Sequence, residues 1–381
     1  MISNRLREIP PFIVMDVLAR AQELERQGKP VVHLEVGQPD FPVPQKIQQA
    51  AVEAIQRGET RYTPSLGIPA LREALAAHYH ARYSVQITPD QIVITSGTSP
   101  GLLLALSALV NPGDEVILAN PGYACYPNHV RFLDGVPVHV RVHPENGFVL
   151  DPSDVRKAIT SRTRAILINS PANPTGAVLP ADVLTELASL GPPLISDEIY
   201  HGLVYGVEDH SALEFTDRAF VLNGFSKLYA MTGYRLGYLI APPEYVRPIE
   251  KAQQNLFICA SSIAQWAGVA AVTQEHPEIP QMVRTYDERR RFIVRRLREL
   301  GFGVQAEPRG AFYVLADARR FDTDSYRLAQ RLLEDVYVAV TPGIDFGSGA
   351  EGFLRFSYAA SLDSIKEAME RLGTYLGRDT R

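Results

Sequence analysis

Short apolar stretches alternate with amphipathic stretches through the middle of the chain, and this alternation limits the fold more than any other feature of the sequence. The apolar stretches have the length and composition of buried strands. They lie at residues 91–95, 115–119, 136–142, 165–169, 193–196, 219–222 and 236–240. Strands that alternate with helices predict a mostly parallel sheet with helices on both faces. We therefore expect an α/β protein whose large domain has three layers, αβα.

The two ends of the chain predict a second, smaller α/β domain. The sequence after residue 240 is mainly helical, and short apolar strands then alternate with helices up to the C-terminus. At the start of the chain we expect an extended arm over residues 1–11, a helix and a strand. The expected parts are an N-terminal arm with part of the small domain, a ligand-binding large domain and a C-terminal small domain, at residues 1–45, 46–280 and 281–381.

The bulk composition argues against several kinds of partner. The 381 residues carry a formal net charge of −5, so neither nucleic acid nor a membrane surface is an expected partner. Cys125 and Cys259 are too few for a disulfide framework. No stretch has the apolar core of a signal peptide or the length needed to cross a bilayer. We expect a cytoplasmic protein and predict no metal site. The arginines at 289–291 and 295–296 are interpreted as the solvated face of a long helix.

Polar residues follow the ends of several expected strands. In parallel sheets, ligands bind at the carboxyl ends of the strands. Asn173 follows the strand at 165–169, and Asp197 and Tyr200 follow the strand at 193–196. A carboxylate such as that of Asp197 needs a cationic partner when it is buried. The alternative is that Asp197 caps a helix, a position that Asp favours.

The turn after residue 222 carries Lys227, and Arg235 follows eight residues later. A lysine between two buried strands is poorly hydrated, so it loses basicity and becomes a usable amine nucleophile. Arginine offers a planar fork that suits a phosphate. The pair therefore suits a cofactor with an aldehyde at one end and a phosphate at the other. The alternative is a surface loop with two ordinary cations.

A turn of small residues, 96–101, joins the strand at 91–95 to a helix that we expect from residue 102. Gly97, Thr98 and Ser99 stand where free backbone amides and the positive end of a helix dipole would face an anion. The turn has no Gly-Lys-Ser/Thr ending, so it is not a nucleotide phosphate loop. The alternative is a helix start that is simply capped by Ser or Thr.

Three more residues are candidates for contacts with a ligand. Gly37 ends the strand at 31–36 and permits close approach of the backbone, although it also fits a plain turn. Tyr62 lies at the tip of a loop, where it could bind a ligand or only pack. Arg355 lies between apolar neighbours in the last expected strand, where an arginine commonly pairs with a carboxylate.

Four motifs stand together in one order: Asn173–Gly176, Asp197–Tyr200, Ser226–Lys227 with Arg235, and Arg355. With these motifs the chain resembles the fold-type I pyridoxal-phosphate (PLP) aminotransferases, the aspartate aminotransferase superfamily of class I/II. The resemblance extends from Val31 to the C-terminal helix. It implies an aminotransferase that moves an amino group between an L-amino acid and a 2-oxo acid by a ping-pong mechanism, and a homodimer with shared sites.

The resemblance also implies roles for the catalytic residues. Lys227 corresponds to the lysine that covalently joins the cofactor aldehyde and then moves the Cα proton. Asp197 corresponds to the carboxylate that keeps the pyridine nitrogen protonated. Tyr200 and Asn173 correspond to donors to the phenolic oxygen of the ring, and Tyr123 to the aromatic residue stacked on its face.

The remaining roles concern the phosphate and the substrate. The residues that correspond to the phosphate site are Gly97, Thr98, Ser99, Ser226 and Arg235. Tyr62 resembles the residue that reaches a phosphate in the neighbouring subunit. Arg355 corresponds to the clamp on the substrate α-carboxylate. Gly37 and Asn173 resemble further substrate contacts.

Two departures from the family pattern concern the phosphate turn. Thr98 stands where many relatives have a second glycine, and Ser99 stands where some aspartate-preferring relatives have a lysine. The second departure weakens an assignment to aspartate. The alternatives are another PLP reaction on the same fold, such as a β-lyase or decarboxylase, and a PLP-sensing regulator without catalysis. A nicotinamide dehydrogenase is disfavoured because no Gly-x-Gly-x-x-Gly follows the first strand.

Overall fold

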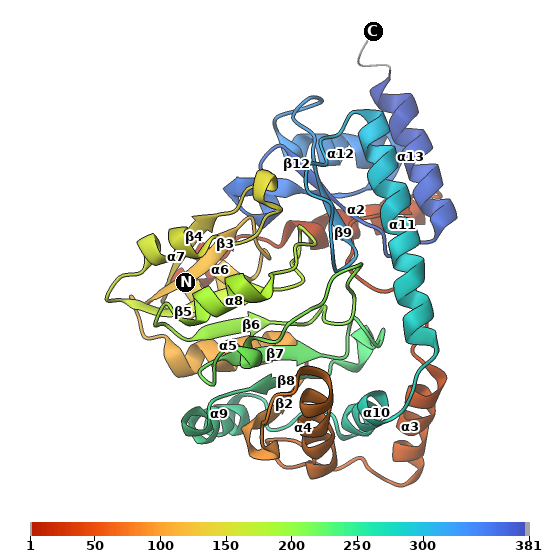
Figure 1. Ribbon diagram of the computed structural model, residues 1–381. Coiled ribbons are helices and arrows are strands. Elements are labelled where there is room, and N and C mark those ends of the chain that lie inside the picture. Colours follow the sequence, from red (N-terminus) through yellow and green to blue (C-terminus); the bar gives the residue numbers. More distant parts are fainter. Residues whose placement is uncertain (1, 378–381) are drawn as a thin grey trace.

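The computed structural model describes residues 2–377, and its centre is a seven-stranded sheet in the order β2-β8-β7-β6-β5-β3-β4 (Figure 1). Its strands are β2 (Ile92–Thr95), β3 (Glu115–Asn120), β4 (Val136–Arg141), β5 (Thr163–Asn169), β6 (Leu194–Asp197), β7 (Phe220–Gly224) and β8 (Gly237–Ile240). Strand β8 is antiparallel to both of its neighbours, and the other pairs are parallel. The expected α/β class with a mostly parallel sheet is confirmed.

Helices cover both faces of this sheet because alternate side chains of each strand point to opposite faces. Ile166 and Ile168 pack into one core, whereas Ala165 and Leu167 pack into the other. The first core is shared with α3 (Gln45–Gln56), α4 (Pro69–Tyr83), α7 (Pro152–Ala158), α8 (Ala181–Ala188) and α10 (Ser262–Thr273). The second core is shared with α5 (Thr98–Leu109), α6 (Tyr126–Phe132) and α9 (Pro243–Leu256).

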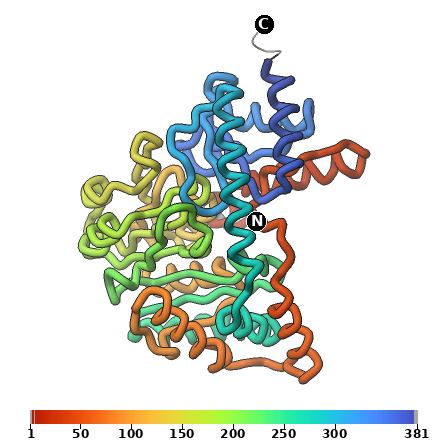
Figure 2. Tube along the Cα trace, turned by 45° about the vertical axis from the view of Figure 1, so that its right-hand side comes forward, coloured from red at the N-terminus to blue at the C-terminus, as the bar shows by residue number. Residues whose placement is uncertain are grey.

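The two ends of the chain pack together above the large sheet (Figures 1 and 2). Strand β1 (Val32–His33) pairs with β10 (Val338–Ala339), and β11 (Thr341–Pro342), β12 (Phe353–Ser357) and β9 (Tyr313–Asp317) form a small antiparallel sheet. The surrounding helices are α2 (Ile13–Arg26), α11 (Glu278–Leu300), α12 (Ser325–Val336) and α13 (Leu362–Leu376). Helix α2 packs its apolar side against Leu333 and Ala339, which joins this N-terminal helix to the C-terminal part of the chain.

Several element bounds differ from the predicted ones. The arm at residues 1–11 contains a short helix, α1 (Asn4–Glu8), where Arg5 pairs with Asp134 at 2.8 Å. Helix α5 begins at Thr98 because Gly97, with a φ of +99°, turns the chain directly from the strand region into the helix. Helix α8 was not predicted. Strand β10 begins only at Val338, because α12 ends with Tyr337 as its C-cap, whose left-handed φ of +57° turns the chain out of the helix.

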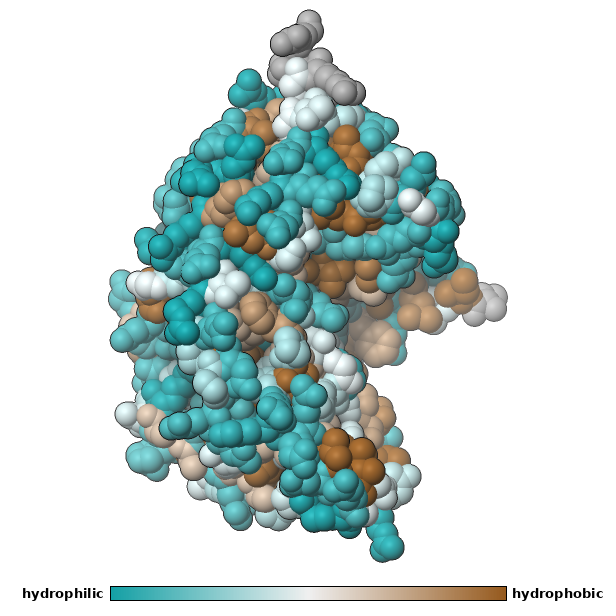
Figure 3. All heavy atoms as spheres, turned by 90° about the vertical axis from the view of Figure 1, so that its right-hand side faces the viewer, coloured by the Kyte–Doolittle hydropathy of each residue, from teal (hydrophilic) through white to brown (hydrophobic). Residues whose placement is uncertain are grey.

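The arginine-rich segment also differs from its interpretation as a wholly solvated face. Arg289 and Arg290 of α11 are buried and pair with Asp40 and Asp287 at 2.8 Å and 2.7 Å. Arg291 remains exposed. The face of the molecule in Figure 3 is nevertheless mostly hydrophilic, with apolar side chains in small separate groups. Among residues 2–377, no helix has the length and apolar character needed to cross a bilayer.

Candidate active site

A cavity of about 310 Å³ lies at the carboxyl edge of the large sheet, below the small sheet. Strands β5, β6 and β7 all end at this edge because they are parallel, so the residues that follow them meet there. Most of the predicted site residues line the cavity: Gly37, Thr98, Ser99, Tyr123, Asn173, Asp197, Tyr200, Ser226, Lys227, Arg235 and Arg355. Gly97 is not part of this lining but immediately precedes Thr98 in the sequence, as the N-cap of α5.

Lys227 lies in the turn after β7, and its Nζ donates a hydrogen bond of 2.6 Å to the carbonyl oxygen of Gly37. The side chain is partly exposed to the cavity but otherwise surrounded by protein. Burial, with the nearby charges of Arg355 and Arg235, lowers the pKa of Lys227 to about 8, and the charge of Asp197 opposes this shift only in part. An amine with such a pKa is unprotonated in roughly a tenth of the molecules at neutral pH.

Asp197 is the last residue of β6, and only 6% of its surface is exposed. Its carboxylate accepts hydrogen bonds from the hydroxyl of Tyr126 at 2.8 Å and from the backbone N–H of Ile199 at 3.2 Å. Burial raises the pKa of Asp197 to about 6, and these hydrogen bonds reduce the shift. A buried carboxylate with two neutral donors is suited to a cationic ligand group.

Arg355 lies in β12 with 2% of its surface exposed. Its guanidinium donates to Asn173 Oδ1 at 2.9 Å, to Thr341 Oγ1 at 3.0 Å and to the carbonyl oxygen of Glu35. The rings of Tyr313 and Phe346 flank it, with centroids 4.4 Å and 4.9 Å from Cζ.

Arg355 forms no ion pair with a carboxylate of the protein within the part of the chain that the structure describes. Its partners there are neutral, and its buried Nε has no hydrogen-bond partner. A permanent charge in such surroundings is costly. The cost is offset when the carboxylate comes from a substrate in the cavity.

The first turn of α5 and the turn around Arg235 form a cradle for an anion. No side chain caps the start of α5, so its backbone N–H groups are free to face a ligand. A Cβ atom at Gly97 would lie 2.5 Å from Nη2 of Arg235, so the close approach of these two segments requires glycine. Thr98 has helical backbone geometry and therefore tolerates a side chain where relatives have glycine.

Two tyrosines of the site were not predicted. Tyr126 holds Asp197, and Tyr313 forms a hydrogen bond of 2.9 Å between its hydroxyl and that of Tyr200. Tyr123 packs edge to face against Tyr126, with the ring centroids 5.2 Å apart. Neither Tyr126 nor Tyr313 follows a motif in the sequence. Tyr126 begins the helix expected after Tyr123, close to the carboxyl end of a strand, and this position is the signal that could have indicated it.

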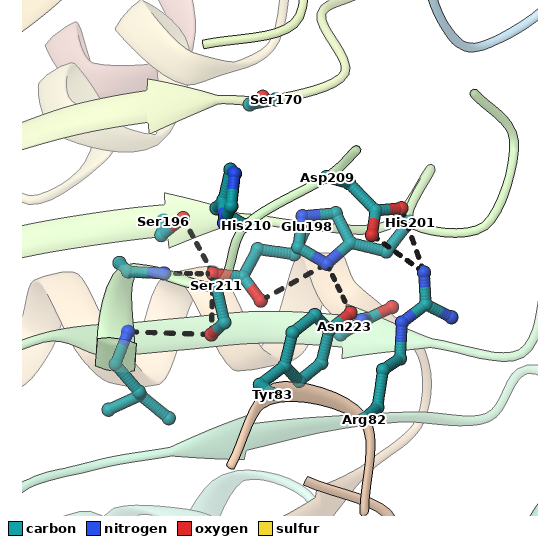
Figure 4. A network of polar contacts seen from close by, with 12 residues as sticks. Arg82, Tyr83, Ser170, Ser196, Glu198, His201, Asp209, His210, Ser211 and Asn223 are labelled. Atoms are coloured by element: carbon teal, nitrogen blue, oxygen red, sulfur yellow. Dashed lines mark hydrogen bonds and ion pairs between the residues drawn. The ribbon is translucent and has the colours of Figure 1, made fainter. Parts of the chain in front are cut away.

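A buried polar network is built around Glu198 and His201, which adjoin Asp197 and Tyr200 in the sequence (Figure 4). The carboxylate of Glu198 accepts hydrogen bonds from Ser196, Ser211 and the backbone N–H of Ala212. His201 Nδ1 lies 2.7 Å from the hydroxyl of Tyr83. Burial raises the pKa of Glu198 to about 8 and lowers that of His201 to about 4. The network fixes the turn that carries both Asp197 and Tyr200.

Tyr62 differs from the other candidates because it lies outside the cavity of its own chain. It follows α3 in an exposed loop, and 82% of its surface is accessible. Of the thirteen predicted residues it is therefore the one that the fold of a single chain keeps away from the others.

Comparison with known proteins identifies the class to which this fold and site belong. Residues 29–372 match the family described as aminotransferase class I and II. The chain is 42% identical to a (5-formylfuran-3-yl)methyl phosphate transaminase of Methanocaldococcus jannaschii, over 99% of this chain and 100% of that protein. It is 41% identical to an aspartate/prephenate aminotransferase of Thermus thermophilus, over 99% of both chains.

Solved structures agree with this result. The structure of Thermus thermophilus aspartate aminotransferase with maleate superimposes with a TM-score of 0.95 at 40% identity, over 98% of this chain and 99% of that one. An aminotransferase from Mycobacterium tuberculosis gives a TM-score of 0.94 at 38% identity, over 99% of both chains. The chain therefore belongs to the aminotransferase class I and II family. It is a PLP-dependent aminotransferase that acts on amino acids and 2-oxo acids.

Proposed function

We propose that the cavity is the site of amino transfer, with the cofactor between Asp197 and the α5 cradle. The donor set fits PLP: a buried carboxylate for the pyridinium, a weakly basic amine for the aldehyde, and free amides with Arg235 for the phosphate. When bound, PLP supplies an aldehyde that condenses with amines and a ring that accepts electrons from the substrate Cα. The convergence of Lys227, Asp197 and Arg355 in one cavity carries this proposal.

Lys227 has two roles in this proposal. Its Nζ would hold the cofactor while no substrate is present, and would move the proton at the substrate Cα once an amino acid had taken its place. Both roles need an unprotonated amine, and a pKa of about 8 provides one near neutral pH. The carbonyl oxygen of Gly37 holds Nζ at the wall of the cavity that Asp197 and Arg355 also line.

Asp197 and Arg355 fix the two partners of the reaction. The carboxylate of Asp197 would hold a proton at the pyridine nitrogen of the bound cofactor, and the hydroxyl of Tyr126 fixes the orientation of that carboxylate. Arg355 binds the α-carboxylate of the substrate, which places the Cα–H bond within reach of Lys227. Asn173 accepts a hydrogen bond from Arg355 and lines the cavity, and it would contact both the substrate and the cofactor ring.

The chemistry of the cavity favours amino acids with apolar side chains over aspartate. Lys227, Arg235 and Arg355 all have roles already, and the described part of the chain brings no further cation into the lining for a distal carboxylate. Ser99 stands at the position where some aspartate-preferring relatives have lysine. Similar proteins include a valine–pyruvate aminotransferase as well as aspartate/prephenate enzymes.

A panel of amino donors, assayed with 2-oxoglutarate and with pyruvate, tests this proposal. We expect amino transfer that requires the acceptor, with leucine or phenylalanine better than aspartate. Release of pyruvate or carbon dioxide without an acceptor would indicate a β-lyase or decarboxylase instead. An aspartate preference of tenfold or more would contradict the proposed substrate class.

We further propose a homodimer in which Tyr62 reaches the phosphate of the neighbouring site. The support is the exposure of Tyr62 outside its own cavity, together with exposed apolar residues such as Leu256 and Ile258. Residues 46–280 would form the cofactor-binding domain, and residues 1–45 and 281–381 a small domain that closes over the substrate and excludes water.

Mixing two variants tests the shared site. Tyr62→Phe weakens binding of the phosphate, and Lys227→Ala removes the amine. A mixed dimer would contain one site with both Lys227 and Tyr62, so unfolding and refolding the variants together should give more activity than either alone. A monomer by light scattering, or no gain on mixing, would contradict the dimer proposal.

A further inference from the structure

The segment from Gly343 to Ala350, here called the junction segment, touches both halves of the molecule. It leads from β11 to β12 of the small sheet. Its Phe346 carbonyl accepts a hydrogen bond of 3.1 Å from the backbone N–H of Gly122, next to Tyr123 of the cavity. Asn120, at the end of β3, bonds to Gly349 and Ser348 at 2.8 Å and 3.1 Å. The junction segment is therefore fixed to the large sheet beside the cavity.

Asp345 of this segment caps helix α2, although the two are more than 300 residues apart in the sequence. Its carboxylate accepts hydrogen bonds from the backbone N–H groups of Ile13 at 3.0 Å and Val14 at 3.2 Å. The helix has no cap of its own, because Phe12 occupies the N-cap position. A carboxylate at this place satisfies two free donors and interacts with the positive end of the helix dipole.

The first turn of α2 forms one wall of the cavity. Phe12, Val14 and Met15 line it. The ring of Phe12 meets the ring of Tyr123 edge to face, with centroids 5.9 Å apart. This wall is apolar, in contrast to the charged side of the cavity formed by Lys227 and Arg355.

Phe346, the residue after Asp345, contacts Arg355, the residue proposed to bind the substrate α-carboxylate. Phe346 is buried, and its ring lies 4.9 Å from the guanidinium carbon of Arg355. Two consecutive residues thus touch the α-carboxylate clamp and the start of the apolar wall.

We propose that Asp345 is a positioning residue that determines specificity for the substrate side chain. It acts through the first turn of α2. The side chains of this turn form the apolar wall, and the side chain of an apolar substrate would pack against that wall. Phe346 keeps this wall at a fixed distance from Arg355. The distance between the two then sets the length of side chain that fits when the substrate carboxylate is bound to Arg355. This inference rests on the proposed function of the cavity.

Asp345→Asn tests the inference because it keeps the size of the side chain and removes its charge and one acceptor. Loss of a helix cap predicts a fall in kcat/KM of about tenfold for leucine or phenylalanine, mainly through KM. Alanine, whose side chain does not reach the wall, should change less than about threefold. Hydrogen exchange in the PLP-loaded protein should become faster at the amides of Ile13 and Val14.

Asp151→Asn is the matched control. Asp151 caps α7 by accepting from Ser153 N–H at 2.8 Å, and it does not line the cavity. This variant should leave kcat/KM for every amino donor unchanged, as well as the hydrogen-exchange rate of the Ile13 amide.

Three results would overturn the inference. Unchanged exchange at Ile13 and Val14 in Asp345→Asn would show that Asp345 does not hold α2, and this result does not depend on the reaction that the protein catalyses. Equal losses for alanine and phenylalanine would show a general structural role. A fall confined to kcat would show that Asp345 affects the chemical step and not the fit of the substrate side chain. If the wild type transferred no amino group, the proposed function would be contradicted. The hydrogen-exchange measurement would still test whether Asp345 holds α2.

Discussion

Lys227 Nζ donates a hydrogen bond of 2.6 Å to the carbonyl oxygen of Gly37, and so joins the central turn of the large sheet to the segment that follows β1. The contact requires a glycine at position 37. A Cβ atom there would overlap the hydroxyl of Tyr313, which itself bonds to the hydroxyl of Tyr200. The amine, the glycine and the two tyrosines therefore form one packed unit at the edge of the cavity.

Gly37→Ala should disturb this unit. We expect activity to fall at least tenfold and the free energy of unfolding to fall by about 1–3 kcal/mol, because the added methyl group must displace Tyr313. Assays of amino transfer and urea denaturation measure both effects. Gly233→Ala is the control, since a Cβ there has no neighbour within 4 Å. Adding Tyr313→Phe should recover part of the lost stability, and no recovery would contradict the proposed overlap.

The pKa of Lys227 predicts the pH dependence of cofactor attachment. In protein freed of PLP, the rate of attachment should rise with pH and reach half its maximum near pH 8, since only the unprotonated amine reacts. Absorbance after mixing with PLP measures the rate. Arg355→Leu removes one of the charges that lower this pKa, so its profile should shift to higher pH. An unshifted profile in Arg355→Leu would contradict the assigned cause.

Tyr126→Phe should weaken the hold on the cofactor. It removes the hydroxyl that donates to Asp197 at 2.8 Å, and a hydrogen bond to a charged group contributes about 1.5–3 kcal/mol. We expect the dissociation constant of PLP to rise by roughly tenfold or more. Tyr79→Phe is the control, because that hydroxyl is also buried and, among residues 2–377, accepts its hydrogen bond from the hydroxyl of Tyr238 and has no contact with Asp197. Equal effects of the two substitutions would exclude a specific role for Tyr126.

Thr341→Val should loosen the carboxylate clamp. Thr341 Oγ1 accepts a hydrogen bond of 3.0 Å from Arg355 and donates one of 3.1 Å to the carbonyl oxygen of Glu35. Its loss leaves the guanidinium less well fixed, so KM for amino donors should rise about fivefold to tenfold while kcat changes less. Thr341→Ser keeps the hydroxyl and should behave like the wild type. A loss of the same size in Thr341→Ser would assign the effect to packing.

Glu198 predicts a loss of stability as the pH rises. Its pKa in the folded state, about 8, lies above the ordinary value of 4.5 in the unfolded chain, so the folded protein binds the extra proton between these values. The stability gained from this proton is complete below about pH 4.5 and is lost as the pH rises to about 8.

Glu198→Gln cannot titrate and isolates this contribution. Between about pH 6.5 and pH 8, the wild type should lose roughly 1.5 kcal/mol of unfolding free energy relative to the variant. Urea denaturation at the two pH values measures the difference. The comparison lies mostly above the range in which His201 takes up a proton on unfolding, which runs from its folded pKa of about 4 to its ordinary value of 6.5. Parallel pH profiles for the two proteins would contradict the assignment.

The sequence predicts the large sheet and most of the site because the signals are local. Apolar runs of strand length mark β5, β6 and β7, and the parallel arrangement then brings Asn173, Asp197 and Lys227 to one edge. Gly97 and Thr98 follow a strand in the same way.

The contacts that hold these residues in place are not local. Tyr126 meets Asp197 and Tyr313 meets Tyr200 across 71 and 113 residues, and no spacing rule connects them. The interpretation of the charge pattern in α11 was partly wrong for a related reason. The sequence around Arg289 is typical of a solvated helix face. Tertiary packing instead buries Arg289 beside Asp40, which lies in a loop that precedes α3.

The proposed function depends most on Lys227 as the residue that binds the cofactor. The direct measurement is borohydride reduction of the PLP-loaded protein, followed by proteolysis and mass spectrometry. We expect one pyridoxyl phosphate group per chain on the peptide that contains Lys227, and none in Lys227→Ala. A label on another lysine, or a wild-type protein that gains no label, would contradict it.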